Sequence, residues 1–128
     1  EKTMSILVGR HIRKMLFDSR LADDVNGHIF LDGLNRECDF PFIVYNYTVE
    51  PGEGSKDYKT DLCQVSVFVF SKDGEQSINL ANDIRAVLEH SKGDYGMFEV
   101  TDTIFEGYRG SLEEDVYIRE LDFNIKTY

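Results

Sequence analysis

The chain has 128 residues, of which 41% are hydrophobic and 30% charged, and 24 acidic against 14 basic residues give a formal net charge of −10. We expect one domain over residues 1–128, since a chain of this length buries roughly two-thirds of the surface that its unfolded form exposes. The acidic excess argues against a general nucleic-acid-binding surface, because phosphate binding depends on clustered Lys and Arg.

The two cysteines, Cys38 and Cys63, are too few for a disulfide framework. Cys63 falls on the apolar face of a predicted strand, where a free thiol behaves as a small hydrophobe. The sequence shows no secretory segment, and its uninterrupted apolar runs are short, whereas a bilayer span needs about 20 residues. We therefore expect an intracellular protein that does not enter a membrane.

The first predicted element is a helix of about four turns with Ser5 as its N-cap. Its apolar positions, at helical spacing, are Met4, Val8, Ile12, Met15 and Leu16. The opposite side holds a basic stripe of Arg10, Arg13 and Lys14, with Arg20 further along the chain. Two interpretations stay open: a solvated helix face, or a docking surface for an acidic neighbour such as another copy of the chain.

Two strands are expected next. Turn residues at 23–27 lead into a short edge strand at residues 28–31, which Asp32 and Gly33 close. After Pro41, residues 42–50 alternate as in a strand, and the first half is apolar on both faces. This pattern indicates that helices cover one side of the strand and that, at one end, the other side of the strand is covered as well.

Residues 51–60 form a polar connection with two glycines, too long for a tight hairpin turn. Its candidate partner contacts are Glu53, Lys56, Tyr58 and Lys59, with Tyr58 as the anchor. The connection is either a hairpin tip without a role or an arm that orders on contact with a neighbour.

Residues 61–92 are the centre of the predicted fold. Cys63, Val65, Val67 and Val69 recur at every second position, which predicts a strand with one face in the core. The next segment predicts an amphipathic helix, and its apolar stripe is Ile78, Ala81, Ile84 and Val87 with Leu88. Asp73 is the expected N-cap, Gln76 completes a capping box, and Gly93 is the expected left-handed stop.

Residues 97–106 predict another strand, in which Phe98, Val100 and Ile104 alternate with polar residues and point inward. We expect residues 107–114 to form the return, because two glycines and several polar residues fall there.

The last strand is expected at residues 115–125. Leu121, Phe123 and Ile125 alternate cleanly, but Val116 and Ile118 fall on the opposite parity. Either a bulge near Arg119 and Glu120 or packing of the first half against another subunit would account for them. Val116 and Ile118 are therefore candidate interface residues.

The order of elements is helix, short strand, hairpin, helix, hairpin. Segregated helices and antiparallel hairpins predict an α+β fold. Its expected form is a two-layer sandwich with an antiparallel sheet of four main strands, a short edge strand, and two helices on one face of the sheet.

The sequence offers no catalytic or metal-binding constellation. His11, His28 and His90 fall on unrelated elements, with His11 expected on a helix surface and His90 at a helix C-terminus. We find no nucleophile beside a base, no paired carboxylates and no metal-ligand spacing. The chain is therefore not expected to be an enzyme or to hold a cofactor.

Four segments follow one another in a recognisable order: residues 41–45 (PFIVY), 62–72 (LCQVSVFVFSK), 78–88 (INLANDIRAVL) and 119–125 (RELDFNI). With the N-terminal helix and the hairpin connection, they resemble the small tail-completion, or tail-terminator, proteins of long-tailed bacteriophages and prophages. The resemblance covers nearly the whole chain. It implies a structural virion protein without catalytic residues, which forms a ring, typically hexameric, completes the tail tube and joins it to the head connector.

The resemblance also implies partners: copies of the chain, the major tail tube protein and head connector proteins. It places the protein in the virion and, during assembly, in the bacterial cytoplasm, without a membrane. An acidic lumen would let DNA pass without specific binding, because acidic side chains do not displace counterions from the phosphates and so contact with them is not favourable.

Two alternatives stay open. One is another head-tail connector component. The other is a homodimeric α+β domain that binds a small molecule between sheet and helices, which requires polar side chains directed inward. Gln64 and Ser66 are the chief candidates for such side chains.

Overall fold

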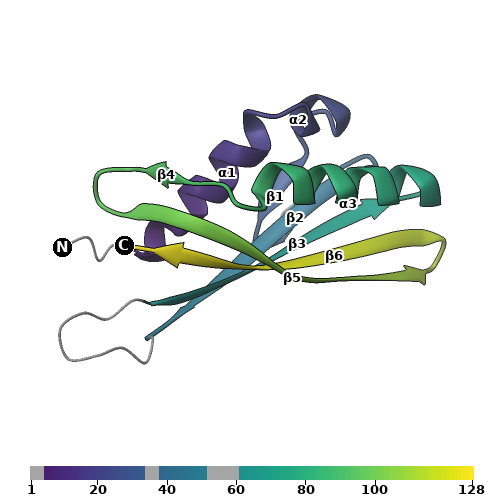
Figure 1. Cartoon of the computed structure of the whole chain (residues 1–128). Coiled ribbons are helices and arrows are strands. Elements are labelled where there is room, and N and C mark those ends of the chain that lie inside the picture. The colour runs from purple at the N-terminus through teal and green to yellow at the C-terminus, as the bar shows by residue number, and fades with distance from the viewer. Residues whose placement is uncertain (1–4, 34–37, 52–60) are drawn as a thin grey trace.

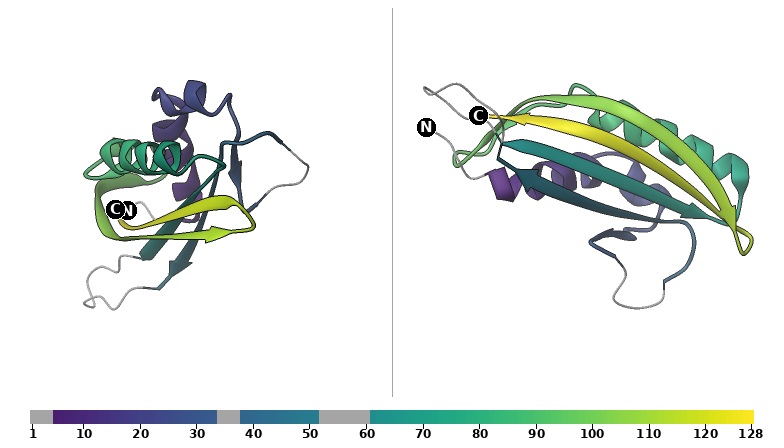
Figure 2. Two further views of the ribbon diagram at one scale, coloured as in Figure 1. Left: turned by 90° about the vertical axis from the view of Figure 1, so that its right-hand side faces the viewer. Right: turned by 90° about the horizontal axis from the view of Figure 1, so that it is seen from below.

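The computed structural model describes residues 5–33, 38–51 and 61–128. Helices lie on one face of a curved sheet, as Figures 1 and 2 show. The elements are η1 (Ser5–Val8), α1 (Gly9–Phe17), α2 (Leu21–Asp24), β1 (Ile29–Leu31), β2 (Phe42–Glu50), β3 (Leu62–Ser71), α3 (Gly74–Leu88), β4 (Gly93–Asp94), β5 (Glu99–Glu113) and β6 (Val116–Thr127). The expected α+β class is confirmed, with a short additional helix, α2.

The sheet has six strands in the order β1-β2-β3-β6-β5-β4. The four main strands β2, β3, β6 and β5 are antiparallel, as expected. The sheet differs from the prediction in two respects: the short edge strand β1 runs parallel to β2, so the sheet is mixed, and the two-residue β4 adds a sixth strand beside β5. Residues 32–41, rather than a tight hairpin turn, separate β1 from β2, so the chain can return to the same end of the sheet.

The core fills the space between the sheet and the helices. Alternate residues of β3 from Cys63 to Val69 are buried, and β6 continues this layer with Leu121, Phe123 and Ile125. The helices cover it with Val8, Ile12, Leu16, Leu80, Ala81, Ile84 and Leu88. Removing this apolar surface from water is the main stabilising term of the fold.

The N-terminus of α3 is capped as predicted at Asp73, whose carboxylate accepts the backbone N–H groups of Glu75 and Gln76 at 3.0 and 3.4 Å. The capping box is not completed as predicted, because the side-chain oxygen of Gln76 accepts the Ser71 hydroxyl at 2.6 Å. The prediction for the C-terminus is also wrong. His90 takes the left-handed conformation (φ 64°), and Gly93 begins β4.

The buried stripe of α3 is rotated relative to the prediction. Its members are Ser77, Leu80, Ala81, Ile84 and Leu88. Ile78, which the spacing places in the stripe, is exposed. The flank of α3 that bears Ile78 therefore faces away from the centre of the core.

Residues 107–113 continue β5 instead of forming the expected return. The reversal is confined to Glu114 and Asp115, which both have positive φ (48° and 66°). Gly107 lies at a register shift between β5 and β6, and a Cβ at Gly110 would clash with the Arg119 side chain. Glycine inside a strand often marks a bulge or a close approach, and both cases occur here.

Another register shift, between Val100 and Asp102, reverses the alternation in β5. Thr103 is therefore buried, and the prediction that Ile104 points inward is wrong. By contrast, β6 pairs with β3 from Ile125 to Tyr117 without a shift, so the bulge expected near Arg119 does not occur in that pairing. Val116 and Ile118 consequently lie on the face of the sheet away from the helices.

Candidate functional site

The basic stripe (Arg10, Arg13 and Lys14) lies on the exposed side of α1. The helix buries its other side through His11, Ile12 and Leu16. Lys14 Nζ donates to Asp18 Oδ2 at 2.5 Å, and this hydrogen bond raises the pKa of Lys14. The Arg13 guanidinium lies 4.4 Å from the centre of the Phe17 ring. The stripe thus presents a pair of guanidinium groups and one ammonium already paired within its own helix.

His11 is fully buried, which contradicts its predicted place on a helix surface. Its Nδ1 lies 2.6 Å from the Tyr95 hydroxyl and its Nε2 lies 2.8 Å from Ser91 Oγ. Burial, and secondarily the charge of Lys14, lowers the pKa of His11 from 6.5 to about 4. The neutral imidazole therefore joins α1 to the segment between α3 and β5, and its burial keeps it from acting as a solvent-accessible base.

The α3–β5 groove lies between the exposed flank of α3 and the strand β5, and it encloses about 280 Å³. Its lining residues are Ile78, Ala81, Asn82, Arg85, Phe105, Tyr108 and Leu121. Ile78 and Tyr108 are 50% and 46% exposed, and Leu112, on the same face of β5 as Tyr108, is 56% exposed. Large apolar side chains are thus exposed together along one border of the molecule, which is a common property of interaction surfaces.

The same border has an unpaired strand edge. On the outer side of β5, β4 pairs with Glu99 and Val100, and the His90 N–H donates to the Thr103 carbonyl at 2.7 Å. Over residues 104–113, no strand in the described part of the chain pairs with this side of β5. Figure 2 shows β5 along one border of the sheet and β1 along the opposite border. An exposed edge of this kind is a template for pairing with another chain.

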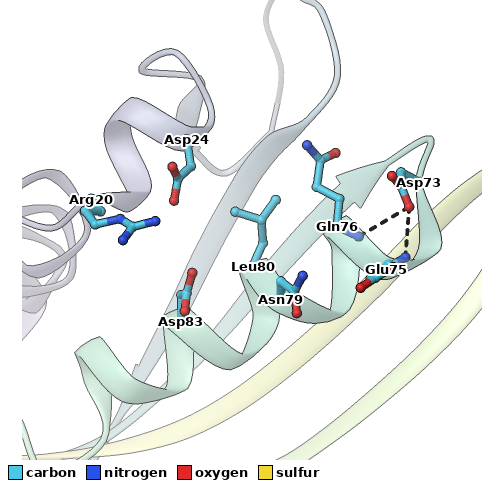
Figure 3. Close-up of a pocket in the computed structure, with 8 residues that line it drawn as sticks. All are labelled: Arg20, Asp24, Asp73, Glu75, Gln76, Asn79, Leu80 and Asp83. Carbon is cyan, nitrogen blue, oxygen red and sulfur yellow. Dashed lines mark hydrogen bonds between the residues drawn. The ribbon is translucent and has the colours of Figure 1, made fainter.

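An acidic hollow of about 360 Å³ lies between α2 and α3 (Figure 3). Its lining residues are Arg20, Asp24, Asp73, Glu75, Gln76, Asn79, Leu80 and Asp83. Arg20 extends toward the space between Asp24 and Asp83, so it belongs to this acidic surface and does not extend the basic stripe (Figure 3). Within residues 5–33, 38–51 and 61–128, no group of three or more His, Cys, Asp or Glu side chains could hold a metal ion.

The open sheet face, opposite the helices, is aromatic at the end near the β5–β6 turn. The Phe42 and Phe70 rings stack with centroids 4.7 Å apart, and Phe68 lies 6.5 Å from Phe70. Ile118 stands opposite Phe70 in the register of β3 and β6. The apolar character expected on both faces of the first half of β2 is thus confirmed.

Polar side chains occupy the open sheet face beyond the aromatic end. The Nη2 atom of Arg109 lies 2.7 Å from Asp122 Oδ2 and 3.3 Å from Glu120 Oε2. The Ser66 hydroxyl donates a hydrogen bond to Asp122 Oδ1 at 2.8 Å. Partial burial, and secondarily Asp122, raises the pKa of Glu120. Gln64 lies on this face as well. The prediction that Gln64 and Ser66 point between the sheet and the helices is therefore wrong.

The predicted interface residues fall into three groups. Arg10, Arg13 and Lys14 lie together on α1, whereas Val116 and Ile118 lie on the open sheet face, in the other layer. Glu53, Lys56, Tyr58 and Lys59 lie outside the described residues. The structure therefore does not unite the first two groups in one surface.

Neither a family model nor a curated protein matches the sequence. Solved structures with a similar fold do exist. The chain is similar to a chain of the structure titled "Virion of native gene transfer agent (GTA) particle", with a TM-score of 0.76 and 11% sequence identity over 91% of this chain and 90% of that chain. The two chains share a fold.

The helical spacing in the sequence indicates that His11 is buried, although a polar residue is normally expected on the helix surface. His11 stands three residues after Val8 and directly before Ile12, so it falls on the buried stripe of the helix. The exposed edge of β5 has no such signal, because strand order decides which strand lies at the border.

None of the helices in the described part of the chain has the length and apolar character that a membrane span requires.

Proposed function

We propose that this protein is a structural, non-enzymatic component of a phage-like particle, where it completes the tail tube and joins it to the head connector. The proposal rests on the fold shared with a chain of a gene transfer agent virion over 91% of this chain, with a TM-score of 0.76. The four ordered segments that resemble tail-completion proteins support the same assignment. At 11% identity these two lines of support are largely independent.

In this proposal the protein assembles as a ring, of six copies if it follows the family that it resembles. A ring requires each copy to offer one surface to a different surface of the next copy. The basic stripe and the α3–β5 groove are two distinct surfaces of suitable kind. The aromatic end of the open sheet face, with Val116 and Ile118, is a third surface for the major tail tube protein or a head connector protein.

The acidic character of the chain suits a part through which DNA passes. A net charge of −10 repels the duplex, so DNA would move through the ring without specific binding. The protein would assemble in the bacterial cytoplasm and remain in the virion, with no membrane involved.

Deletion of the gene from its particle-forming cluster, followed by electron microscopy of the induced particles, tests this function. We expect filled heads and separate tails, with joined particles restored by a wild-type copy on a plasmid. A plasmid copy with an early stop codon is the control. Normal numbers of joined particles without the protein would contradict the proposal.

A further inference from the structure

We propose that the α3–β5 groove and the unpaired edge of β5 receive a second copy of this chain, which docks through its β1 edge and its basic stripe. The inference rests on the proposed function only for the identity of the partner as another copy. The two surfaces that meet differ from each other, so the contact is heterologous.

The receiving surface combines an apolar patch with free backbone groups. Ile78, Tyr108 and Leu112 are exposed beside a strand edge that stays unpaired over residues 104–113 in the described structure. A docked strand would bond to that edge and bury these side chains, as in recognition by strand addition. Neither feature contributes to the core of a single copy.

The charges on the receiving surface point to the basic stripe as its complement. Exposed acids lie along β5 and in its turn at Glu106, Glu114 and Asp115, and the cation that lines the groove, Arg85, is already paired with Glu89. Arg10 and Arg13 are exposed guanidinium groups on a helix whose carboxylate Asp18 is already bonded to Lys14. Because two copies with a net charge of −10 repel each other overall, a stable contact has to bring these basic residues against acids.

The docking surface lies on the opposite border of the molecule. β1 is the terminal strand of the sheet on that side, and only β2 pairs with it among the described strands. Leu31 is 47% exposed and has the parity of the buried Ile29, so it lies on the same side of the sheet as the helices. The Arg13 guanidinium of α1 is near Tyr45 of β2, since its charge opposes the burial that raises the pKa of Tyr45, so the basic stripe lies over the strand next to β1. The surface therefore offers a strand edge, an apolar side chain and two guanidinium groups.

The β5–β6 turn fixes two of the acids in an unfavourable backbone conformation. Glu114 and Asp115 have φ values of 48° and 66°, where Asn or Gly is normally preferred. Backbone conformations of this kind tend to persist where a protein uses them. In the proposed contact, the turn holds two carboxylates toward the stripe of the neighbouring copy.

Two surface variants test the contact by sedimentation velocity over a range of concentrations up to millimolar. Ile78→Glu alters the receiving surface, and Arg10→Glu with Arg13→Glu alters the docking surface. Wild-type protein should form assemblies larger than a dimer, which weaken as salt is raised. Each variant alone should associate at least about tenfold more weakly. An equimolar mixture should form a 1:1 complex and nothing larger, because only one intact pair of surfaces remains.

The matched control is Lys72→Glu with Lys126→Glu, which makes the same change in net charge as the Arg10 and Arg13 pair at exposed positions outside both surfaces. It should assemble like the wild type, and circular dichroism should show that all variants fold. Wild-type protein that stays monomeric or stops at a dimer, or a mixture that does not associate, would overturn the inference. If the particles are joined normally after gene deletion and the two variants nevertheless form the 1:1 complex, the proposed function is rejected and the proposed contact is supported.

Discussion

Replacement of His11 should reduce the sensitivity of this fold to acid. In the folded chain His11 is buried between the Tyr95 hydroxyl and Ser91 Oγ, and burial lowers its pKa from 6.5 to about 4. The unfolded chain therefore binds a proton at a higher pH than the folded chain does. Stability from the neutral imidazole is fully present above about pH 6.5, and it is lost as the pH falls from 6.5 toward 4.

The size of the loss follows from the separation of the two pKa values. The fall from 6.5 to about 4 corresponds to roughly 3 kcal/mol of unfolding free energy, at about 1.4 kcal/mol for each pH unit. Such a loss is a large fraction of the 5–15 kcal/mol, in order of magnitude, that stabilises a typical domain. His11→Gln should cost about 1 kcal/mol at pH 7 through its poorer hydrogen bonds, and the variant should then be less affected by acid.

Urea unfolding followed by circular dichroism at pH 7, 5.5 and 4 measures this difference. His28→Gln is the matched control, since it removes a histidine from the surface and should keep the wild-type dependence on pH. The comparison with the wild type cancels the carboxylates that titrate over the same range. Equal losses of stability in the wild type and His11→Gln, or an imidazole that titrates near pH 6.5 by NMR, would refute the reasoning.

Three further substitutions test local features of the fold by urea unfolding at pH 7. Asp73→Ala should lower the unfolding free energy by about 1 kcal/mol, because it removes the N-cap of α3; a change near zero would contradict the capping role. Gly9→Ala should destabilise by about 1 kcal/mol in spite of the better helix propensity of Ala, since its Cβ would lie 2.7 Å from the Tyr47 ring; a stabilised variant would show that the ring moves freely. Asp115→Gly should stabilise by up to about 1 kcal/mol because φ is 66° there, and a loss of stability would mean that the carboxylate makes a stronger contact.

The elements with a single clear period could be predicted from the sequence. β2 spans Phe42–Glu50 as expected, and β3, at Leu62–Ser71, contains the alternating residues from Cys63 to Val69 that predict it. Both strands alternate without interruption and have no register shift between them, so each inward position follows from the one before. The N-cap at Asp73 could be predicted as well, because it depends on local geometry alone.

The features that could not be predicted depend on long-range pairing. Two register shifts in β5 reverse its alternation, and the sequence contains no local mark for the one between Val100 and Asp102. Gly107 and Gly110 indicate a turn by composition, yet β6 supplies paired residues opposite them and keeps the chain extended. The parallel direction of β1 likewise does not follow from the pattern within the strand.

Several failures of the local rules lie at one border of the molecule. The exposed Ile78, the glycine-containing half of β5 and the positive φ values at Glu114 and Asp115 all lie on or beside the α3–β5 groove and its strand edge. A sequence that folds well is usually consistent at every level, and its exceptions tend to occur where function demands them. Core packing within one copy does not explain the exposed Ile78 or the positive φ values of the turn, whereas a neighbouring copy would bury Ile78, pair with β5 and bring guanidinium groups to the acids of the turn. This border, where these exceptions lie together, is therefore the border on which we expect assembly to depend.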